Sequence, residues 1–365
     1  MHKHLIYLAL GLLFSIDSFA ICKSEGSKPD SINDGPYIFY VKSRFVAKWI
    51  ENSLLKTDYI KSRNFADTKE KFDLLFDYND LCNSLKLKPD YKQVYSGVDS
   101  IAAISDIHGG FNGYIKLMKS LGIIDNNLNW KFGSGHLVVL GDSFDRGNMV
   151  TEVLWHLFGL EKQAAKAGGR VHMLLGNHET LMLRKDMRYT NEKYFRVQTI
   201  SGIEYSDLYS EESVLGKWLR YQPVLLSIDD ILFVHGGISI EMVRRKMKIE
   251  EINRIFSNMT LRTVIPSDDE IADLKFLNKE DGPIWYRGYF TETNYCESKI
   301  DSILHFYDKS HIVVGHTVSG EIKSLFENKI FGIDAGLGND QSGAMLIYKD
   351  GLFYQGLATG ERIKL

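Results

Sequence analysis

Five short polar clusters recur along this chain, and each follows directly on an apolar run rich in β-branched residues. Each cluster brings a His, Asp or Asn side chain together with one or more glycines. They are Asp106–Gly110, Gly141–Gly147, Gly176–Glu179, His235–Gly237 and Gly315–Thr317. The pattern predicts side chains at the carboxyl ends of successive strands, where open α/β sheets place their sites. A two-metal hydrolytic centre requires this arrangement, because ligands from several elements must converge on ions only ~3.5–4 Å apart.

The order of elements indicates sheets with helices packed on them. From about residue 100 the chain repeats strand, polar tip and amphipathic helix, with helices expected at 114–121, 150–167 and 180–187. Beyond residue 224 the strands follow one another through short turns, which is typical of antiparallel pairing. We therefore expect an α/β fold in which two mixed β-sheets are sandwiched between helices. The expected strands are 101–104, 136–140, 171–175, 224–228, 231–234, 312–314, 330–333, 344–348 and 352–354.

The first residues have the three sections of a secretory signal peptide. Lys3 precedes an apolar run over 5–16, and Ser18 and Ala20 are the small residues of a cleavage site. An uncleaved membrane anchor is the alternative, but a spanning helix needs ~20 apolar residues. A lipoprotein attached through Cys22 is a second alternative, although Ile21 is bulky for the preceding position. We therefore expect a periplasmic or secreted protein with no stable membrane anchor.

Four segments are expected along the chain. A signal peptide over 1–20 is followed by a flexible leader over 21–36, which is polar and rich in turn residues. An extension over 37–96 contains a β-hairpin at 37–50 and a helix within 67–85. The catalytic domain is expected to occupy 97–365.

Charge and cysteine content limit the remaining possibilities. The formal net charge of the 365-residue chain is −3, which gives no electrostatic reason to expect nucleic acid as a partner. The three cysteines Cys22, Cys82 and Cys296 are an odd number, so at least one thiol is left over and no pairing is fixed. None of them has the spacing of a metal site.

The clusters supply a set of ligands for two metal ions. Asp106 and His108 are two residues apart in an extended segment, so both point the same way and can bind one ion. Asp142 has two carboxylate oxygens and is the natural bridge between two ions. Asn177 adds a neutral ligand, and His235 and His316 complete the second ion. Taken alone, Asn177 also fits a helix cap and His235 fits a buried core histidine.

Four further residues are candidates for proton transfer and phosphate binding. His178 points away from the ligand direction of its neighbour and is the expected general acid, with Asp145 orienting it and raising its pKa. Arg146 offers a planar fork that suits phosphate oxygens. Arg287 is a second candidate for the same task, on weaker grounds. The expected chemistry is hydrolysis of a phosphate ester by a hydroxide that bridges the two metals.

The five clusters resemble the metallophosphatases of the phosphoprotein phosphatase family, within the calcineurin-like phosphoesterases. The second, third and fourth clusters match that family's Gly-Asp-x-x-Asp-Arg-Gly, Gly-Asn-His-Glu and His-Gly-Gly motifs in full, and the fifth matches its Gly-His pair. The first reads Ser105-Asp106-Ile107-His108-Gly109, with Ser in place of the leading Gly. The resemblance covers roughly residues 100–350, and together with the signal peptide it is strongest to the bacterial, Shewanella-like branch.

The resemblance implies the calcineurin-like metallophosphoesterase fold and a division of the ligands. One metal would be held by Asp106, His108 and Asp142, and the other by Asp142, Asn177, His235 and His316. It implies two divalent ions, with manganese, iron or zinc as the family's metals. The implied substrates are phosphotyrosine or phosphoserine proteins or small phosphate esters.

Two other functions are weighed against this hypothesis. Hydrolysis of dinucleoside polyphosphates or phosphodiesters would use the same centre, but the Asp145-Arg146 pair together with Glu179 favours the phosphoprotein type. A non-catalytic metal- or phosphate-binding protein would be expected to lack a ligand or the acid, and every one of these residues is present in the sequence.

Overall fold

The structure is a computed structural model that describes residues 31–261, 267–293, 295–339 and 343–365. Residues Ile32–Leu365 form one compact unit. The predicted signal peptide and most of the predicted leader lie outside the described residues. Among the described residues, no helix is both long and apolar enough to cross a membrane.

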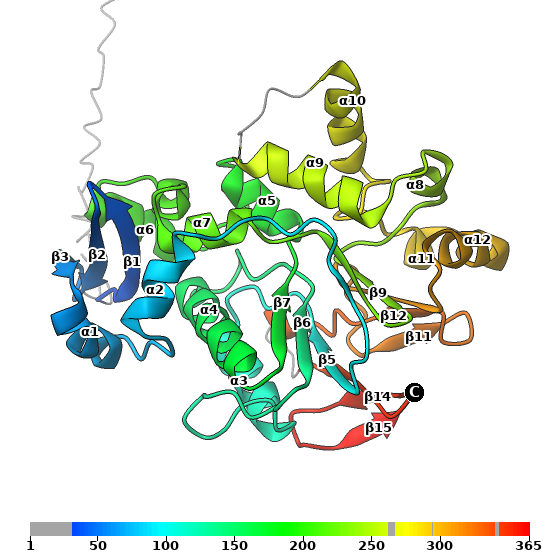
Figure 1. Ribbon diagram of the computed structural model, residues 1–365, viewed down its shortest axis with the longest axis horizontal. Helices are drawn as coiled ribbons and strands as arrows, with labels where there is room; N and C mark the ends of the chain where they lie inside the picture. The colour runs from blue at the N-terminus through cyan, green and yellow to red at the C-terminus, as the bar shows by residue number, and fades with distance from the viewer. Residues whose placement is uncertain (1–30, 262–266, 294, 340–342) are drawn as a thin grey trace, which may run out of the picture. The chain divides into compact units, whose positions relative to one another are not determined.

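The N-terminal extension is built on a small antiparallel sheet (Figure 1). The predicted hairpin is present. A third strand, which was not predicted, pairs with its second strand. The last three residues of the predicted leader belong to the first strand, where the carbonyl of Pro36 accepts a hydrogen bond of 2.7 Å from Trp155 Nε1. The strands are β1 (Asp34–Val41), β2 (Arg44–Glu51) and β3 (Leu54–Ile60).

The prediction of a single helix within 67–85 is wrong, because the chain turns in the middle of that range. Asp73 adopts a left-handed conformation with φ 50°, which ends the first helical segment. This turn lets Phe76 bury its ring against Trp155 and Phe158, with ring centroids 5.3 and 4.9 Å away. The observed elements are η1 (Ser62–Asn64), α1 (Phe65–Lys71) and α2 (Tyr78–Ser84).

Two six-stranded mixed sheets follow, as predicted. In the first, β5, β6 and β7 are parallel and β13 pairs with β5 in the antiparallel sense. Its order is β15 (Arg362–Lys364), β14 (Leu352–Gly356), β13 (Met345–Lys349), β5 (Ser100–Ile104), β6 (His136–Val139) and β7 (Arg170–Met173).

The second sheet mixes both senses as well. Strands β9, β10 and β12 are parallel, whereas β8 and β9 form the predicted antiparallel hairpin. Its order is β11 (Lys323–Leu325), β12 (Ile330–Gly332), β10 (His311–Val314), β9 (Ile231–Val234), β8 (Leu225–Ile228) and β4 (Val94–Tyr95).

Alternation along the strands explains why the sheets face each other. In β5, Ile101 and Ala103 join the apolar cluster that also holds Phe233 and Val313 of the second sheet. Their neighbours Ala102 and Ile104 join a different cluster, which contains the helices on the outer face. Successive strand residues point to opposite faces, so each sheet has one face toward its partner and one toward helices.

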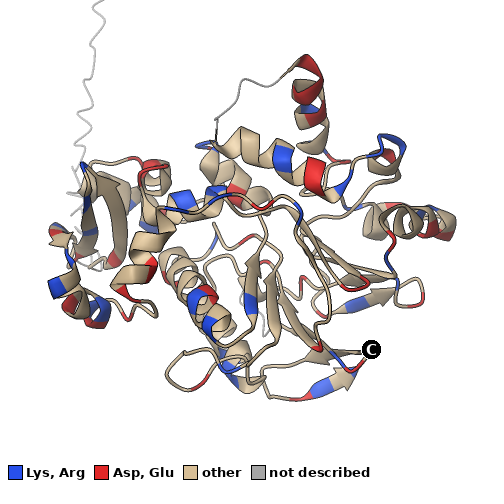
Figure 2. Cartoon of the chain, viewed as in Figure 1, with Lys and Arg blue, Asp and Glu red and all other residues tan. Residues whose placement is uncertain are grey.

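Helices cover the outer faces and carry the remaining segments (Figure 1). α6 contacts β2 and β3, and α7 contacts β1, so the segment after the third polar cluster packs on the N-terminal sheet. Lys and Arg are interspersed with Asp and Glu in Figure 2, except that α10 opens with an acidic turn. The helical elements are α3 (Phe111–Ser120), α4 (Val150–Lys166), α5 (Asn177–Leu183), α6 (Glu192–Ser201), η2 (Tyr205–Tyr209), α7 (Val214–Arg220), α8 (Ile240–Arg244), α9 (Ile249–Leu261), α10 (Asp268–Leu277), α11 (Gly288–Thr291), α12 (Glu297–Tyr307) and η3 (Leu337–Asn339).

Candidate metal centre

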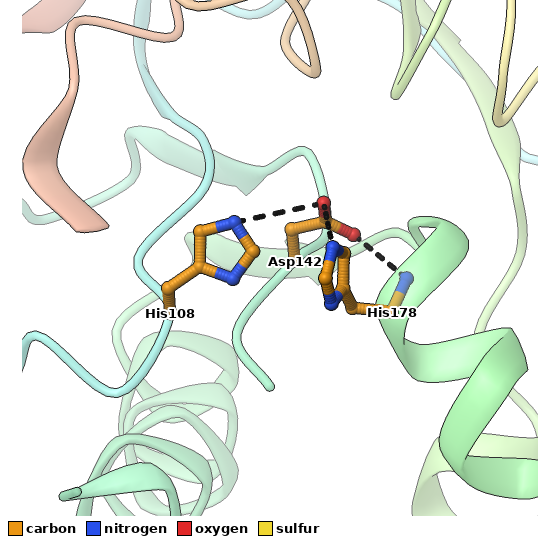
Figure 3. A group of neighbouring side chains, drawn as sticks. All are labelled: His108, Asp142 and His178. Carbon is orange, nitrogen blue, oxygen red and sulfur yellow. Dashed lines mark hydrogen bonds and ion pairs between the residues drawn. The ribbon is translucent and has the colours of Figure 1, made fainter. Parts of the chain in front are cut away.

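The structure brings the five polar clusters together at the carboxyl ends of the two sheets. Asp142, which follows β6, is central to the group. Its Oδ2 lies 3.2 Å from His235 Nε2, 3.7 Å from His178 Nε2 and 3.8 Å from His108 Nε2. Figure 3 shows His108 and His178 on either side of this carboxylate. One carboxylate is therefore within reach of imidazoles from three separate loops.

The other predicted ligands complete two groups around Asp142. Asp106 Oδ1 lies 3.8 Å from His108 Nε2, and Asn177 Oδ1 lies 2.9 Å from His235 Nε2. Asp142, His235 and His316 place ligand atoms within 4.8 Å of one another, as do His108, Asp142 and His178. All six predicted ligands are at most 5% exposed. Asp142 is thus shared between two groups of potential ligands.

The loops reach this geometry by bending sharply at the strand ends. Six of the predicted site residues, none of them glycine, have positive φ between 46° and 69°. Backbones of this kind persist where the surrounding structure holds them, and they cluster at functional sites. A Cβ added at Gly315 would lie 1.9 Å from Ser105 Oγ, so only glycine permits the first and fifth loops to approach this closely. The six are Asp106, His108, Asp142, Asp145, Arg146 and His316.

Backbone carbonyls orient two of the imidazole ligands. His108 Nδ1 lies 2.7 Å from the Phe144 carbonyl oxygen, and His235 Nδ1 lies 2.7 Å from that of Leu140. A carbonyl accepts only, so Nδ1 carries a proton in both rings and Nε2 faces the centre. This is the arrangement by which protein histidines are prepared to bind metals.

The donor set fits divalent cations. His108 Nε2 and His316 Nε2 are buried and have no hydrogen-bond partner among the described residues. Burial lowers the pKa of His108 to about 4 and that of His316 to about 2, so both rings keep a free lone pair. Neutral imidazole and carboxylate oxygen are ligands of first-row metals.

The buried carboxylates of the centre also favour the binding of cations. Burial, reinforced by the carboxylate of Asp106, raises the pKa of Asp334 to about 8. Burial opposes protonation of His235, but the carboxylates of Asp142, Asp106 and Glu179 together outweigh it and raise the pKa of His235 to about 9. Buried carboxylates gathered in one place are stable only when positive charge compensates them. Metal ions at the free Nε2 atoms would supply that charge.

His178 and Asp145 form the predicted pair beside the ligands. His178 Nδ1 lies 2.6 Å from Asp145 Oδ2, and both residues are buried. Burial alone lowers the pKa of His178, but the carboxylates of Asp142 and Asp145 together raise it above its usual value. The contact leaves Nε2 as the ring nitrogen that faces Asp142.

Both predicted phosphate-binding arginines lie at the rim. Arg146 is exposed, and the site carboxylates Asp106 and Asp142 act electrostatically on Arg287. Arg287 Nη1 donates a hydrogen bond of 2.7 Å to the carbonyl of His316, which fixes this side chain at the fifth loop. The structure therefore brings the second arginine to the centre although no motif identified it.

Three polar residues of the site were given no structural or chemical role from the sequence. Glu179 accepts hydrogen bonds from the backbone N–H groups of Asp142, Ser143 and Gly176, at 2.7–2.8 Å, and so ties the second loop to the third. A glutamate three residues after a helix cap commonly accepts the backbone N–H of the cap, so the sequence already indicated the bond from Gly176. Ser105 Oγ donates to Asp106 Oδ2 at 2.5 Å. Asp334 is buried, and its Oδ1 accepts a hydrogen bond of 3.1 Å from the backbone N–H of Gly336.

Among the described residues, the histidines and cysteines outside the motifs belong to neither group of candidate ligands. His172 Nε2 pairs with His136 Nδ1 at 3.0 Å, and His156 lies between the Tyr114 hydroxyl and the Leu128 carbonyl. Cys82 and Cys296 are free thiols, and Cys22 lies outside the described residues. The three histidines are therefore bound to other parts of the fold and not to the centre.

Comparison with known proteins agrees with this geometry. Residues 100–320 match the calcineurin-like phosphoesterase family. The chain belongs to this family. It is 30% identical to Shewanella-like protein phosphatase 1 of Plasmodium berghei over 268 residues, which are 69% of this chain and 72% of that protein. This calcineurin-like phosphoesterase is thus a metallophosphatase of the Shewanella-like type.

Solved structures lead to the same family. A cold-active protein-tyrosine phosphatase of a psychrophilic Shewanella species superposes with a TM-score of 0.81 at 34% identity, covering 92% of this chain and all of that one. A protein serine/threonine phosphatase of Saccharomyces cerevisiae has a TM-score of 0.53 at 16% identity, covering 80% of this chain and 90% of that one, and shares the fold. The calcineurin-like phosphoesterase described here is a metal-dependent phosphoester hydrolase with its candidate ligands at the expected strand ends.

Proposed function

We propose that the protein is an exported phosphatase that uses two divalent metal ions to hydrolyse phosphomonoesters. The observation that carries the proposal is the position of Asp142. Its carboxylate belongs both to a group with His108 and to a group with His235 and His316, and two of these imidazoles have an unpaired Nε2. A bridging carboxylate between two sets of ligands is the arrangement that a two-metal centre needs.

The ligands divide into two sets that share Asp142. Asp106 and His108 would hold one ion with it, and Asn177, His235 and His316 the other. Mixed imidazole and oxygen donors suit manganese, iron or zinc. Ions held by these residues would supply a water of lowered pKa as the nucleophile and positive charge for the phosphoryl oxygens.

The chain's own residues supply the remaining steps. Arg146 and Arg287 bind phosphate oxygens at the rim and orient the ester for in-line attack. His178 donates a proton from Nε2 to the leaving oxygen. Asp145 keeps Nδ1 protonated and stabilises the imidazolium until that transfer occurs. Proton donation matters because the leaving oxygen departs as an alcohol or phenol instead of a high-energy anion.

The proposed substrates are phosphotyrosine or phosphoserine proteins, or small phosphate esters. The similarity to a phosphatase named for protein tyrosine, over 92% of this chain, supports a phosphorylated protein. The apolar run and small residues within 1–20 support export to the periplasm or the medium. Cell fractionation and N-terminal sequencing of the mature protein test export, with a new N-terminus expected at Ile21.

The proposed reaction is tested with a substrate panel on the purified protein. Phosphotyrosine and phosphoserine peptides, a dinucleoside tetraphosphate and a phosphodiester are compared with Mn²⁺ added and after chelation. We expect hydrolysis of the phosphomonoesters, loss of activity on chelation, and little turnover of the other two. Preferential hydrolysis of the dinucleotide would instead establish the alternative function.

Two variants test the assigned roles. Asp142→Asn is expected to lose metal and about 10³-fold or more in kcat, because the bridging charge disappears. His178→Asn is expected to keep its metal and lose about 10²–10⁴-fold, the usual contribution of a general acid. Metal content by mass spectrometry separates the two outcomes. Unchanged activity in either variant would refute the mechanism.

A further inference from the structure

An exposed aromatic ring lies directly against the proposed general acid. The ring centroid of Tyr189 is 5.0 Å from that of His178, and the two planes are tilted by 46°. His178 is 3% exposed, whereas Tyr189 is 46% exposed. One part of the tyrosine side chain therefore contacts the acid, and another part is exposed to solvent.

The backbone around Tyr189 is bound to the catalytic loop. Arg146 N donates to the carbonyl oxygen of Tyr189 at 3.1 Å, and Thr190 Oγ1 donates to Asp145 Oδ1 at 3.1 Å. Asn191 Nδ2 donates to the carbonyl oxygen of Arg146 at 2.7 Å. The backbone that carries the ring is thus bound to the phosphate-binding arginine and to the partner of the acid.

The place of the acid determines where the leaving group must lie. A general acid has to be within hydrogen-bond reach of the oxygen that it protonates. The carbon skeleton attached to that oxygen then extends past His178 toward solvent. Tyr189 is the exposed ring in contact with His178, so the leaving group passes beside it. Trp285, by contrast, contacts the metal-ligand candidate His316, with ring centroids 5.7 Å apart.

We infer that Tyr189 is a specificity-determining residue that selects aryl phosphates by packing against the aromatic ring of the leaving group. The inference rests on the proposed phosphatase function and names the substrate class that this site prefers. Two aromatic rings with centroids 4.5–7 Å apart attract each other beyond the burial of their area. The phosphoserine side chain has a single methylene and offers no ring for this contact.

The test compares two peptides of identical sequence, one with phosphotyrosine and one with phosphoserine. Their kcat/KM values are measured on the full chain with Mn²⁺ for wild type, Tyr189→Ala, Tyr189→Leu and Tyr189→Phe. In the Ala and Leu variants, kcat/KM for the phosphotyrosine peptide should fall by about three- to tenfold, mainly through KM. The value for the phosphoserine peptide should change by less than about twofold, and Tyr189→Phe should restore the ratio.

Tyr59→Ala is the matched control, because Tyr59 is 51% exposed on the separate N-terminal sheet. It should leave both values unchanged. An equal loss for both peptides with a shifted pH profile would show that Tyr189 acts through His178, and would overturn the inference. An unaltered ratio would also overturn it while leaving the proposed function intact. Failure of the wild type to hydrolyse both peptides and a small aryl phosphate ester would refute the inference and the proposed function together.

Discussion

At the scale of single residues, the serine that departs from the family pattern orients a proposed metal ligand. Ser105 stands where the pattern has glycine, and its hydroxyl donates to Asp106 Oδ2. The same oxygen accepts the backbone N–H of His316 at 2.9 Å. With Oδ2 occupied twice, Oδ1 is the oxygen left to face His108. Ser105 therefore fixes the rotamer of a proposed metal ligand, a role that local sequence could not reveal because it depends on the fifth loop.

Removing the Ser105 hydroxyl should weaken metal binding. Outer hydrogen bonds to a ligand are typically worth ~10–100-fold in metal affinity, so Ser105→Ala and Ser105→Gly should raise the half-saturating Mn²⁺ concentration by about tenfold. The kcat at saturating metal should change by less than about twofold, since the ligands themselves remain. Activity titrations in metal buffers measure both quantities.

Ser143→Ala is the control for this prediction. Ser143 is also fully buried in a site loop, but its Oγ has no hydrogen-bond partner among the described residues. Losing an unpaired hydroxyl costs little, so metal affinity should not change. Equal effects of Ser105→Ala and Ser143→Ala would show that the Ser105 contact does not orient Asp106.

At the scale of elements, the N-terminal sheet supports the catalytic loops. Lys193 on α6 contacts Asp34 Oδ1 of β1 at 2.6 Å and donates to the carbonyl of Asn148 at 2.7 Å. The hydroxyl of Tyr37 also donates to Asp34. These contacts link the first strand to the segment that follows Arg146. The extension is therefore part of the structure that holds the proposed phosphate-binding loop.

Breaking the ion pair between Asp34 and Lys193 should destabilise the protein. The side chains are 0% and 17% exposed, so Asp34→Asn leaves a poorly solvated ammonium. We expect a loss of about 2–3 kcal/mol in the free energy of unfolding, below the ~3–5 kcal/mol of a fully buried pair because Lys193 keeps some water. Urea denaturation measures it, and the double variant Asp34→Asn/Lys193→Met should recover part of the loss.

An exposed pair provides the comparison. Arg188 and Asp186 have side chains that are 63% and 29% exposed, although their contact is 2.5 Å long. Asp186→Asn should therefore cost less than about 1 kcal/mol. A loss for Asp34→Asn no larger than that for Asp186→Asn would contradict a structural role for the buried pair.

At the scale of the whole molecule, the centre joins the two sheets. Asp106, Asp142 and Asn177 follow strands of the first sheet, and His235 and His316 follow strands of the second. Both sheets also bury a common apolar interface. Ions held by ligands from both sheets would add further contacts between the sheets in the folded protein. Folding and metal binding should therefore be coupled.

Metal should consequently stabilise the folded protein. With Mn²⁺ at about 100 times its dissociation constant, the free energy of unfolding should rise by about 2.7 kcal/mol for a single site, and the midpoint temperature should rise with it. Chelation should reverse the effect. Asp142→Asn should show little response to Mn²⁺, whereas Asp186→Asn should respond like the wild type. If the midpoint temperature of the wild type does not change when Mn²⁺ is added, the coupling is refuted.

The sequence by itself determined the family, the two mixed sheets and the convergence of the proposed ligands. The family could be identified because each motif depends only on the local spacing of its residues. The convergence of the ligands could be predicted because neighbouring parallel strands end at the same edge of a sheet. The tertiary structure alone decided the rest: the break in the helix at Asp73, the support of α6 by the N-terminal sheet, the hydrogen bond that holds Arg287 at the fifth loop, and the approach of Asp334 and Tyr189 to the centre. Those contacts join segments whose separation along the chain carries no periodic or spacing signal, and only packing in three dimensions brings them together.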